Sequence, residues 1–168
     1  VQMEWLIKEY AKKDGINYVR GNRKAVRTVY EEGSTFEIGK GNLIREGKDI
    51  LFIASGQLVS DALIVAKELE EKGYNVEIID MFTIKPLDVN LILERTKGKE
   101  KVFTIENHSI NNGLGSSVAE VIAENNVPVK LHRIGVNERF GQVGTPEFLQ
   151  KEFGLDAESI KQEVLNNL

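Results

Sequence analysis

Residues 103–120 read Phe-Thr-Ile-Glu-Asn-His-Ser-Ile-Asn-Asn-Gly-Leu-Gly-Ser-Ser-Val-Ala-Glu. A buried strand comes first, followed by a turn that carries Glu106 and His108, and then by Gly113 and Gly115 at the start of a helix. Open α/β sheets bind their ligands at the carboxyl ends of their strands. A carboxylate and an imidazole at this position therefore make the turn a candidate site.

The order of strand and then helix repeats on both sides of this stretch. Residues 50–54 form a continuous apolar run, which is typical of a strand covered on both faces. Further strands are predicted at 76–80, 102–105 and 129–134, and helices at about 57–72, 88–96, 115–125, from 145 and from 156. Strands that alternate with helices predict an α/β fold with a mainly parallel sheet and right-handed crossovers.

The first part of the chain is less regular. Apolar residues fall on one helical face over residues 1–13, and residues 16–19 are typical of a short strand. Residues 20–34 lack a clear period and predict an extended linker. An edge strand is predicted over 36–44, although Lys40-Gly41 interrupts it. Because the helical pattern begins at Val1, we expect the chain to be a piece of a longer protein.

Composition narrows the class of protein. Hydrophobic residues make up 41% and charged residues 29%, which predicts a soluble globular domain. The net charge is −4 without a block of Lys and Arg, so nucleic acid is not an expected partner. The chain lacks cysteine, which excludes disulfides and thiolate metal sites and fits a cytoplasmic location. Its apolar runs are too short to span a membrane.

The residues of the central turn allow more than one interpretation. Gly113 and Gly115 suggest a dinucleotide-binding turn, but Val118 stands where a third small residue belongs, so close packing of helix on sheet is favoured. Glu106 and His108 are suited to acid–base chemistry, yet they lack an accompanying nucleophile motif. A structural or interface hydrogen-bond network is the favoured role. His132 lies in a predicted strand, where a structural role is more common.

Four basic residues follow the predicted strand at 16–19: Arg20, Arg23, Lys24 and Arg27. Such a cluster is suited to a phosphate or carboxylate anion, because guanidinium groups bind these oxygens through paired hydrogen bonds. The alternative is a solvated linker, which composition alone favours.

Seven short motifs, taken in order, resemble transketolase over nearly the whole chain. They are Tyr18-Val-Arg-Gly-Asn-Arg23, Phe36-Glu-Ile-Gly-Lys40, Ile53-Ala-Ser-Gly56, Thr83-Ile-Lys-Pro-Leu-Asp88, Glu106-Asn-His-Ser109, Gly113-Leu-Gly115 and Ile134-Gly-Val-Asn-Glu-Arg-Phe-Gly141. The likeness is greatest to the carboxyl-terminal section of transketolases that are split into two polypeptides. It extends less closely to deoxyxylulose-phosphate synthases and to beta subunits of 2-oxoacid dehydrogenases.

The resemblance implies a fold and a domain division. It implies a three-layer α/β/α domain with a five-stranded mixed sheet, of which one strand is antiparallel. Residues 36–168 would be the transketolase C-terminal domain, which helps to build the dimer, and residues 1–35 the tail of the pyrimidine-binding domain and the linker. These enzymes use thiamine diphosphate and magnesium. The Gly-Asp-Gly metal–diphosphate motif is missing here, since Lys13-Asp-Gly15 differs from it, so this chain alone is not expected to bind the cofactor, hold a metal or catalyse.

The resemblance also implies a function for the parent protein. A transketolase transfers a two-carbon ketol unit between sugar phosphates in the pentose phosphate pathway, and Arg23 would bind the substrate phosphate. The partner would be an amino-terminal section, in the same or a separate chain. Two alternatives remain open: a relative that uses pyruvate or another 2-oxoacid as donor, and a stand-alone module that binds or senses a small anion.

Overall fold

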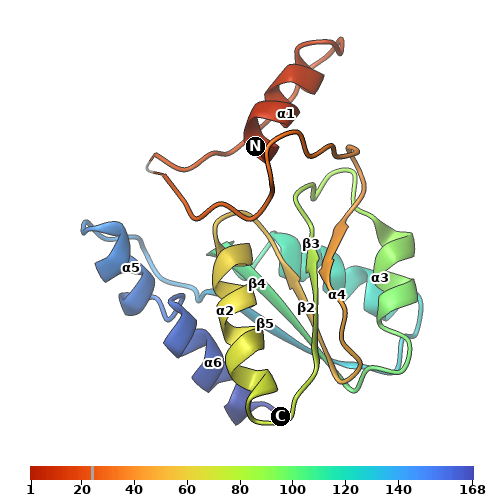
Figure 1. Ribbon diagram of the computed structural model, residues 1–168, viewed down its shortest axis with the longest axis vertical. Helices are drawn as coiled ribbons and strands as arrows, with labels where there is room; N and C mark the ends of the chain where they lie inside the picture. Colours follow the sequence, from red (N-terminus) through yellow and green to blue (C-terminus); the bar gives the residue numbers. More distant parts are fainter. Residues whose placement is uncertain (24) are drawn as a thin grey trace.

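The computed structural model describes residues 1–23 and 25–168, and its centre is one five-stranded mixed sheet (Figure 1). The strands lie in the order β1-β3-β2-β4-β5, and β1 alone runs antiparallel to its neighbour. Their bounds are β1 Asn42–Arg45, β2 Ile50–Ala54, β3 Val76–Asp80, β4 Lys101–Ser109 and β5 Lys130–Val136. The predicted α/β fold with a mostly parallel mixed sheet is confirmed.

Helices cover both faces of this sheet and make the three layers. On one face lie α2 (Leu58–Glu70) and α6 (Ala157–Asn166), and on the other lie α3 (Val89–Arg95) and α4 (Leu114–Glu124). All five residues of β2 and of β3 are buried. Burial on both faces explains why the sequences of these strands do not alternate between apolar and polar residues.

The aromatic centre of the core joins the two middle strands. Phe103 on β4 packs edge-to-face on Phe52 of β2, with ring centroids 5.8 Å apart, and its other side faces His132 of β5 at 5.7 Å. Neither Phe52 nor Phe103 has any exposed surface. These rings therefore fix how β2, β4 and β5 meet in the layer beneath α2.

Two predictions on the amino-terminal side need correction. Residues 16–19 are not a strand: Ile16 is fully exposed, Tyr18 is 83% exposed, and the described residues offer them no strand to pair with. The edge strand expected at 36–44 shortens to β1, because the chain turns through Gly39, with φ at +86°, before it reaches the sheet. Helix α1 (Gln2–Tyr10) and the irregular course of residues 20–34 agree with the sequence.

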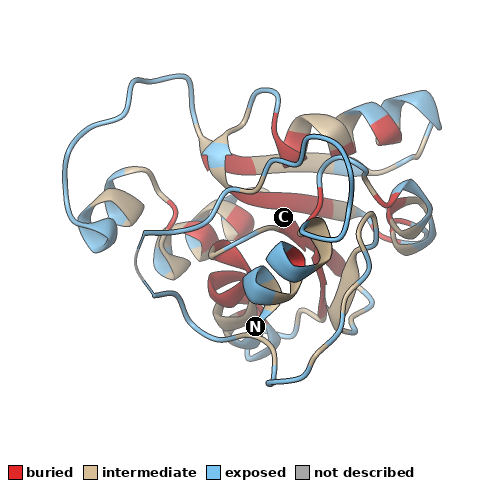
Figure 2. Cartoon of the chain, turned by 90° about the horizontal axis from the view of Figure 1, so that it is seen from above, coloured by how far each residue is buried: buried red, intermediate tan, exposed pale blue. Residues whose placement is uncertain are grey.

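Helix α1 packs on the domain through a small aromatic cluster. The ring of Trp5 lies 5.5 Å from that of Phe36 and 6.5 Å from that of Phe82, and Tyr30 lies edge-on to Phe36 at 4.7 Å. Between α1 and Tyr30 the described residues run over the outside of the molecule and are almost all exposed (Figure 2).

The carboxyl-terminal part ends in two capped helices. Thr145 accepts a hydrogen bond from the N–H of Phe148 at the start of α5 (Pro146–Glu152), and Asp156 accepts one from Ser159 at the start of α6. Both helices begin where the sequence predicts them, with Thr145 and Asp156 as their N-cap residues. Helix α5 buries none of its residues. None of the described helices is both long and apolar enough to cross a membrane.

We predict that Phe103→Ala lowers the free energy of unfolding by about 3–5 kcal/mol, because it removes a fully buried ring and leaves a cavity. Phe140→Ala is the matched control, since that ring is 98% exposed, and its effect should stay within about 0.5 kcal/mol. Urea unfolding followed by circular dichroism measures both. Equal losses would show that the core is not centred on this ring.

Candidate functional site

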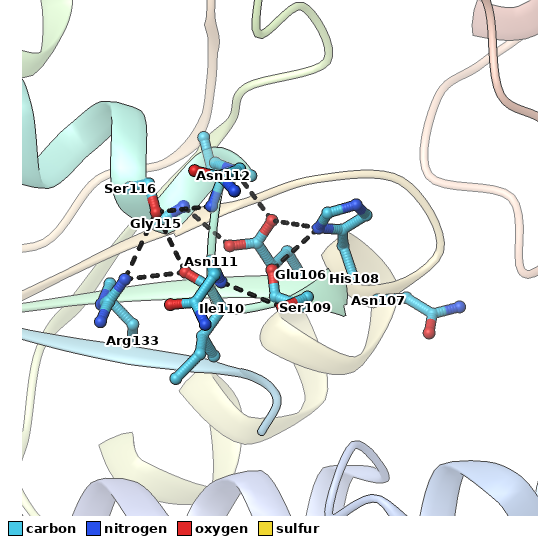
Figure 3. Close-up of polar contacts among 12 residues, drawn as sticks. Glu106, Asn107, His108, Ser109, Ile110, Asn111, Asn112, Gly115, Ser116 and Arg133 are labelled. Atoms are coloured by element: carbon cyan, nitrogen blue, oxygen red, sulfur yellow. Dashed lines mark hydrogen bonds and ion pairs between the residues drawn. The ribbon is translucent and has the colours of Figure 1, made fainter. Parts of the chain in front are cut away.

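The candidate site is built around Glu106, near the carboxyl end of β4. Its side chain is buried, and its two carboxylate oxygens accept hydrogen bonds from the N–H groups of Leu114, at 2.8 Å, and Gly115, at 2.7 Å (Figure 3). These N–H groups open α4 and have no partner within the helix. The negative charge also lies at the positive end of the helix dipole, so the contact is stabilised both by its hydrogen bonds and by the dipole.

The two glycines of the motif make this contact possible. A Cβ on Gly113 would lie 2.1 Å from Oε2 of Glu106, and one on Gly115 would lie 2.8 Å from Oγ1 of Thr104 on β4. The helix therefore approaches the sheet as closely as its backbone permits. Because Glu106 fills the place at the helix start where a dinucleotide phosphate would bind, the geometry speaks against a nucleotide turn.

A second set of hydrogen bonds orders the turn between β4 and α4. Arg133 on β5 donates through Nη1 to the carbonyl of Ile110 at 2.7 Å, and the hydroxyl of Ser116 donates to the same carbonyl at 3.1 Å. The N–H of Asn112 donates to Oγ of Ser116 at 2.9 Å. Asn112 itself has φ at +61°, in the left-handed region that asparagine tolerates better than most residues.

The histidines lie apart from a catalytic arrangement. Nδ1 of His108 is 3.9 Å from Oε2 of Glu106 and 2.8 Å from the carbonyl oxygen of Ser109, and the ring is largely exposed. Because 3.9 Å is beyond hydrogen-bond distance, Glu106 does not act as the hydrogen-bonded base of His108 in this structure. His132 lies elsewhere, with Nε2 2.8 Å from Oε1 of Glu163 on α6.

The basic cluster divides among different partners. Arg20 donates through Nη2 to the carbonyl of Asn107 at 2.6 Å, which brings it beside the Glu106 turn. Arg27 pairs with Asp61 on α2 at 2.7 Å, whereas Arg23 is exposed. Lys24 lies outside the described residues. The sequence grouped these side chains but gave no sign that Arg20 reaches β4, since the contact joins residues 87 positions apart.

A buried carboxylate that sequence reasoning did not single out lies at the end of β3. Oδ2 of Asp80 accepts hydrogen bonds from Nε2 of Gln2 at 2.7 Å and from the hydroxyl of Tyr30 at 2.6 Å, while Oδ1 is buried with no partner among the described residues. Burial raises the pKa of Asp80, and the two hydrogen bonds only partly oppose this. Burial, followed by the charge of Asp80, likewise raises the pKa of Tyr30.

The residues present do not fit a magnesium–diphosphate site. Within residues 1–23 and 25–168, no three His, Cys, Asp or Glu side chains come together in a way that could hold a metal ion. Buried carboxylates such as Glu106 and Asp80 are engaged by neutral donors of the protein itself. The described surface hollows lie at the opposite, amino edge of the sheet, between residues 97–100 and 125–128.

The fold and the turn after β4 together define an α/β domain in which the carboxylate of Glu106 binds the N–H groups at the start of α4. The family model described as the C-terminal domain of transketolase matches residues 39–160. A chain described as a transketolase C-terminal section, from Methanocaldococcus jannaschii, is 44% identical over 165 residues, which are 97% of this chain and 51% of that one. The chain belongs to the transketolase C-terminal domain family.

Two further relatives are similar over most of the chain. The 6-deoxy-6-sulfo-D-fructose transketolase subunit SqwH of a Clostridium species is 40% identical over 147 residues, 88% of this chain and 45% of that one. A solved split-gene transketolase, an inactive β4 tetramer, matches with a TM-score of 0.92 and 36% identity over 98% of this chain and 54% of that one. The chain thus spans about half the length of its relatives, and the family implies a parent that depends on thiamine diphosphate.

We predict that Glu106→Ala lowers the free energy of unfolding by about 2–4 kcal/mol, because it leaves two buried N–H groups without an acceptor. Glu106→Gln keeps one acceptor oxygen and should cost less. Glu120→Ala, an exposed change on the same helix, is the control and should stay within about 0.5 kcal/mol. Thermal and urea unfolding measure these values, and a Glu106→Ala protein as stable as the control would contradict the capping role.

A second prediction concerns pH. The folded pKa of Asp80 is raised, so the native state binds more protons than the unfolded state above about pH 4, and the stability contributed by Asp80 falls as pH rises through the folded pKa. The titratable group that faces Asp80 among the described residues is Tyr30, whose raised pKa keeps it neutral at these pH values, and the neighbouring Gln2 and Asn42 are uncharged.

Asp80→Asn removes this titration. The unfolding free energy of the variant, relative to the wild type, should therefore increase from pH 4 upwards and level off above the folded pKa. Urea unfolding at half-unit pH steps gives the difference curve. A flat curve, or one that falls with pH, would show that Asp80 has an ordinary or lowered pKa.

Proposed function

We propose that the chain is the carboxyl-terminal section of a split transketolase, whose assembly transfers a two-carbon ketol unit between sugar phosphates in the pentose phosphate pathway. The likeness of nearly the whole chain to a split-gene transketolase, at a TM-score of 0.92 and 36% identity, is the observation that carries the proposal. It is supported by relatives described as transketolase sections or subunits with other sugar substrates.

Within that assembly the chain has a supporting part. Residues 36–168 serve as the C-terminal domain, which contributes to dimerisation, and residues 1–35 as the tail of the pyrimidine-binding domain and its linker. An amino-terminal section, in the same or a separate chain of a cytoplasmic assembly, supplies the site for thiamine diphosphate and magnesium. The isolated chain is accordingly inactive. The family match over residues 39–160 and the packing of Trp5 on Phe36 and Phe82 support this division.

Arg23 anchors the phosphate of the sugar substrate. Its side chain is exposed and makes no hydrogen bond or ion pair with another described residue, so it can meet a ligand. Its neighbour Arg20 is tied to the carbonyl of Asn107, at the carboxyl edge of the sheet where α/β proteins bind their ligands. A guanidinium group is the side chain best suited to a phosphate dianion, because it donates two parallel hydrogen bonds.

The test is a ketol-transfer assay on the complete assembly with thiamine diphosphate, magnesium, xylulose 5-phosphate and ribose 5-phosphate. We expect turnover of this sugar pair without pyruvate. Turnover with pyruvate alone would move the protein to the synthase or dehydrogenase branch. Silence with both donors, together with thermal stabilisation by a simple anion such as phosphate, would favour a small-anion binding module instead.

In the same assay Arg23→Ala should raise KM for xylulose 5-phosphate about 10- to 100-fold with a smaller change in kcat, because a charge-assisted contact to a remote phosphate is lost. Lys13→Ala is the control, an exposed basic residue in the same stretch, and should leave KM unchanged. A large effect of Arg20→Ala with none of Arg23→Ala would place the phosphate anchor on Arg20.

A further inference from the structure

A single oxygen atom, Oδ2 of Asp80, accepts hydrogen bonds from residues on both sides of the stretch that carries the arginines. Gln2, in the first turn of α1, and Tyr30, after the exposed stretch, both donate to Oδ2 of Asp80, at 2.7 and 2.6 Å. Between them lies the arginine segment, residues 11–29, which contains Arg20, Arg23 and Arg27. The stretch from Gln2 to Tyr30, which comprises α1 and then the arginine segment, is therefore a closed loop whose two ends meet at a single carboxylate.

The carboxylate itself belongs to the central sheet of the domain. Asp80 is the last residue of β3, lies directly opposite Asn42 of β1, and is 1% exposed. The next residue, Met81, donates its N–H to the carbonyl of Ala54 on β2. The position of Oδ2 is thus fixed by the sheet and not by the loop.

The carboxylate is shielded from solvent, with 1% of Asp80 exposed. Tyr30, which donates to it, belongs to the aromatic cluster with Phe36, and Trp5 of α1 and Phe82 pack against Phe36. A hydrogen bond is stronger in such a low-dielectric site, and a buried acceptor that loses its donors there is costly. Each donor that leaves Asp80 would therefore strand a buried oxygen.

The arginine segment has little else to hold it. Its described residues are exposed except Val19 and Val29, which are half-buried, and Val29 alone packs against the hydrophobic core. Its side-chain contacts with the rest of the described chain are the ion pair of Lys12 with Glu9 of α1 and the hydrogen bonds of Arg20 to Asn107 and of Arg27 to Asp61. Segments with so few buried contacts open easily unless polar contacts close them.

We propose that Asp80 is a positioning residue, a clamp that holds the start of the helix before the arginine segment through Gln2 and the residue after the segment through Tyr30, and so fixes where the segment's guanidinium groups meet a phosphorylated substrate. Asp80 does not touch the substrate; it acts through the loop that it closes. The inference deepens the proposed function and rests on it for the substrate, whereas the clamp itself rests only on the contacts of Gln2, Tyr30 and Asp80.

The first test needs no turnover. Tyr30→Phe keeps the ring in its aromatic cluster and removes only the hydroxyl donor. Limited trypsin digestion of the intact protein, read by mass spectrometry, should cut after Lys12, Lys13, Arg20, Arg23 or Arg27 about tenfold faster than in the wild type, the factor expected for loss of one hydrogen bond to a charged group. Tyr74→Phe, a half-buried tyrosine next to β3, is the control and should leave these rates unchanged.

Two substitutions of Asp80 distinguish the effect of its acceptor oxygens from the effect of its charge. Asp80→Asn retains an acceptor oxygen for Gln2 and Tyr30 and should keep digestion slow, whereas Asp80→Ala removes the acceptor and should speed it up at least as much as Tyr30→Phe. Asp49→Ala, which deletes a carboxylate that accepts from the N–H of Asn75 away from the segment, controls for general loosening. Unchanged digestion in Tyr30→Phe and Asp80→Ala would overturn the clamp.

The second test uses the active assembly. Tyr30→Phe and Asp80→Ala should raise KM for the sugar phosphate about fivefold or more with kcat nearly constant, and Asp80→Asn should restore KM. Faster digestion with unchanged KM would overturn the positioning role. If the wild-type assembly transfers no ketol unit, the proposed function fails, and the digestion series still decides whether the clamp exists.

Discussion

The carboxylate of Glu106 is the contact on which the carboxyl edge of the sheet depends. It closes the start of α4, and the bare backbones of Gly113 and Gly115 let that helix come close enough to be closed. The same contact sets the course of the turn that presents Asn107, whose carbonyl receives Arg20 from the amino-terminal stretch. A helix cap inside the domain is in this way connected to the segment proposed to meet the substrate.

The sequence predicted most of what is local and repetitive. The apolar run at 50–54 located β2, and the helices predicted from 145 and from 156 correspond to α5 and α6. The strand–turn–helix order of residues 103–120 placed Glu106 and His108 in a turn, but both lie in β4, which extends to Ser109. The short strand expected at 16–19 does not form. A stretch with β-branched and aromatic residues needs a neighbouring strand to pair with, and residues 16–19 lie on the surface of the molecule instead. Asp80 was not singled out, because its partners lie 78 and 50 residues away and nothing in the sequence Val-Glu-Ile-Ile-Asp of β3 indicates them.

The two buried carboxylates, Glu106 and Asp80, join different segments of the chain. Glu106 holds a helix to its own sheet, whereas Asp80 holds the amino-terminal stretch to the domain with the help of the Trp5, Tyr30, Phe36 and Phe82 rings. This arrangement suits a chain that spans about half of its relatives and is proposed to complete an active site that lies mainly elsewhere. Exposed apolar side chains such as Ile16, Tyr18 and Phe140 are available to such an assembly.

This chain is proposed to support a thiamine-diphosphate site that the amino-terminal section contains. The most direct test of this proposal is calorimetric titration of thiamine diphosphate with magnesium into the chain alone, into the amino-terminal section alone, and into their mixture. The account predicts no measurable heat of binding for the chain alone and the tightest binding for the mixture. Binding to the chain alone with the affinity of the mixture would contradict it.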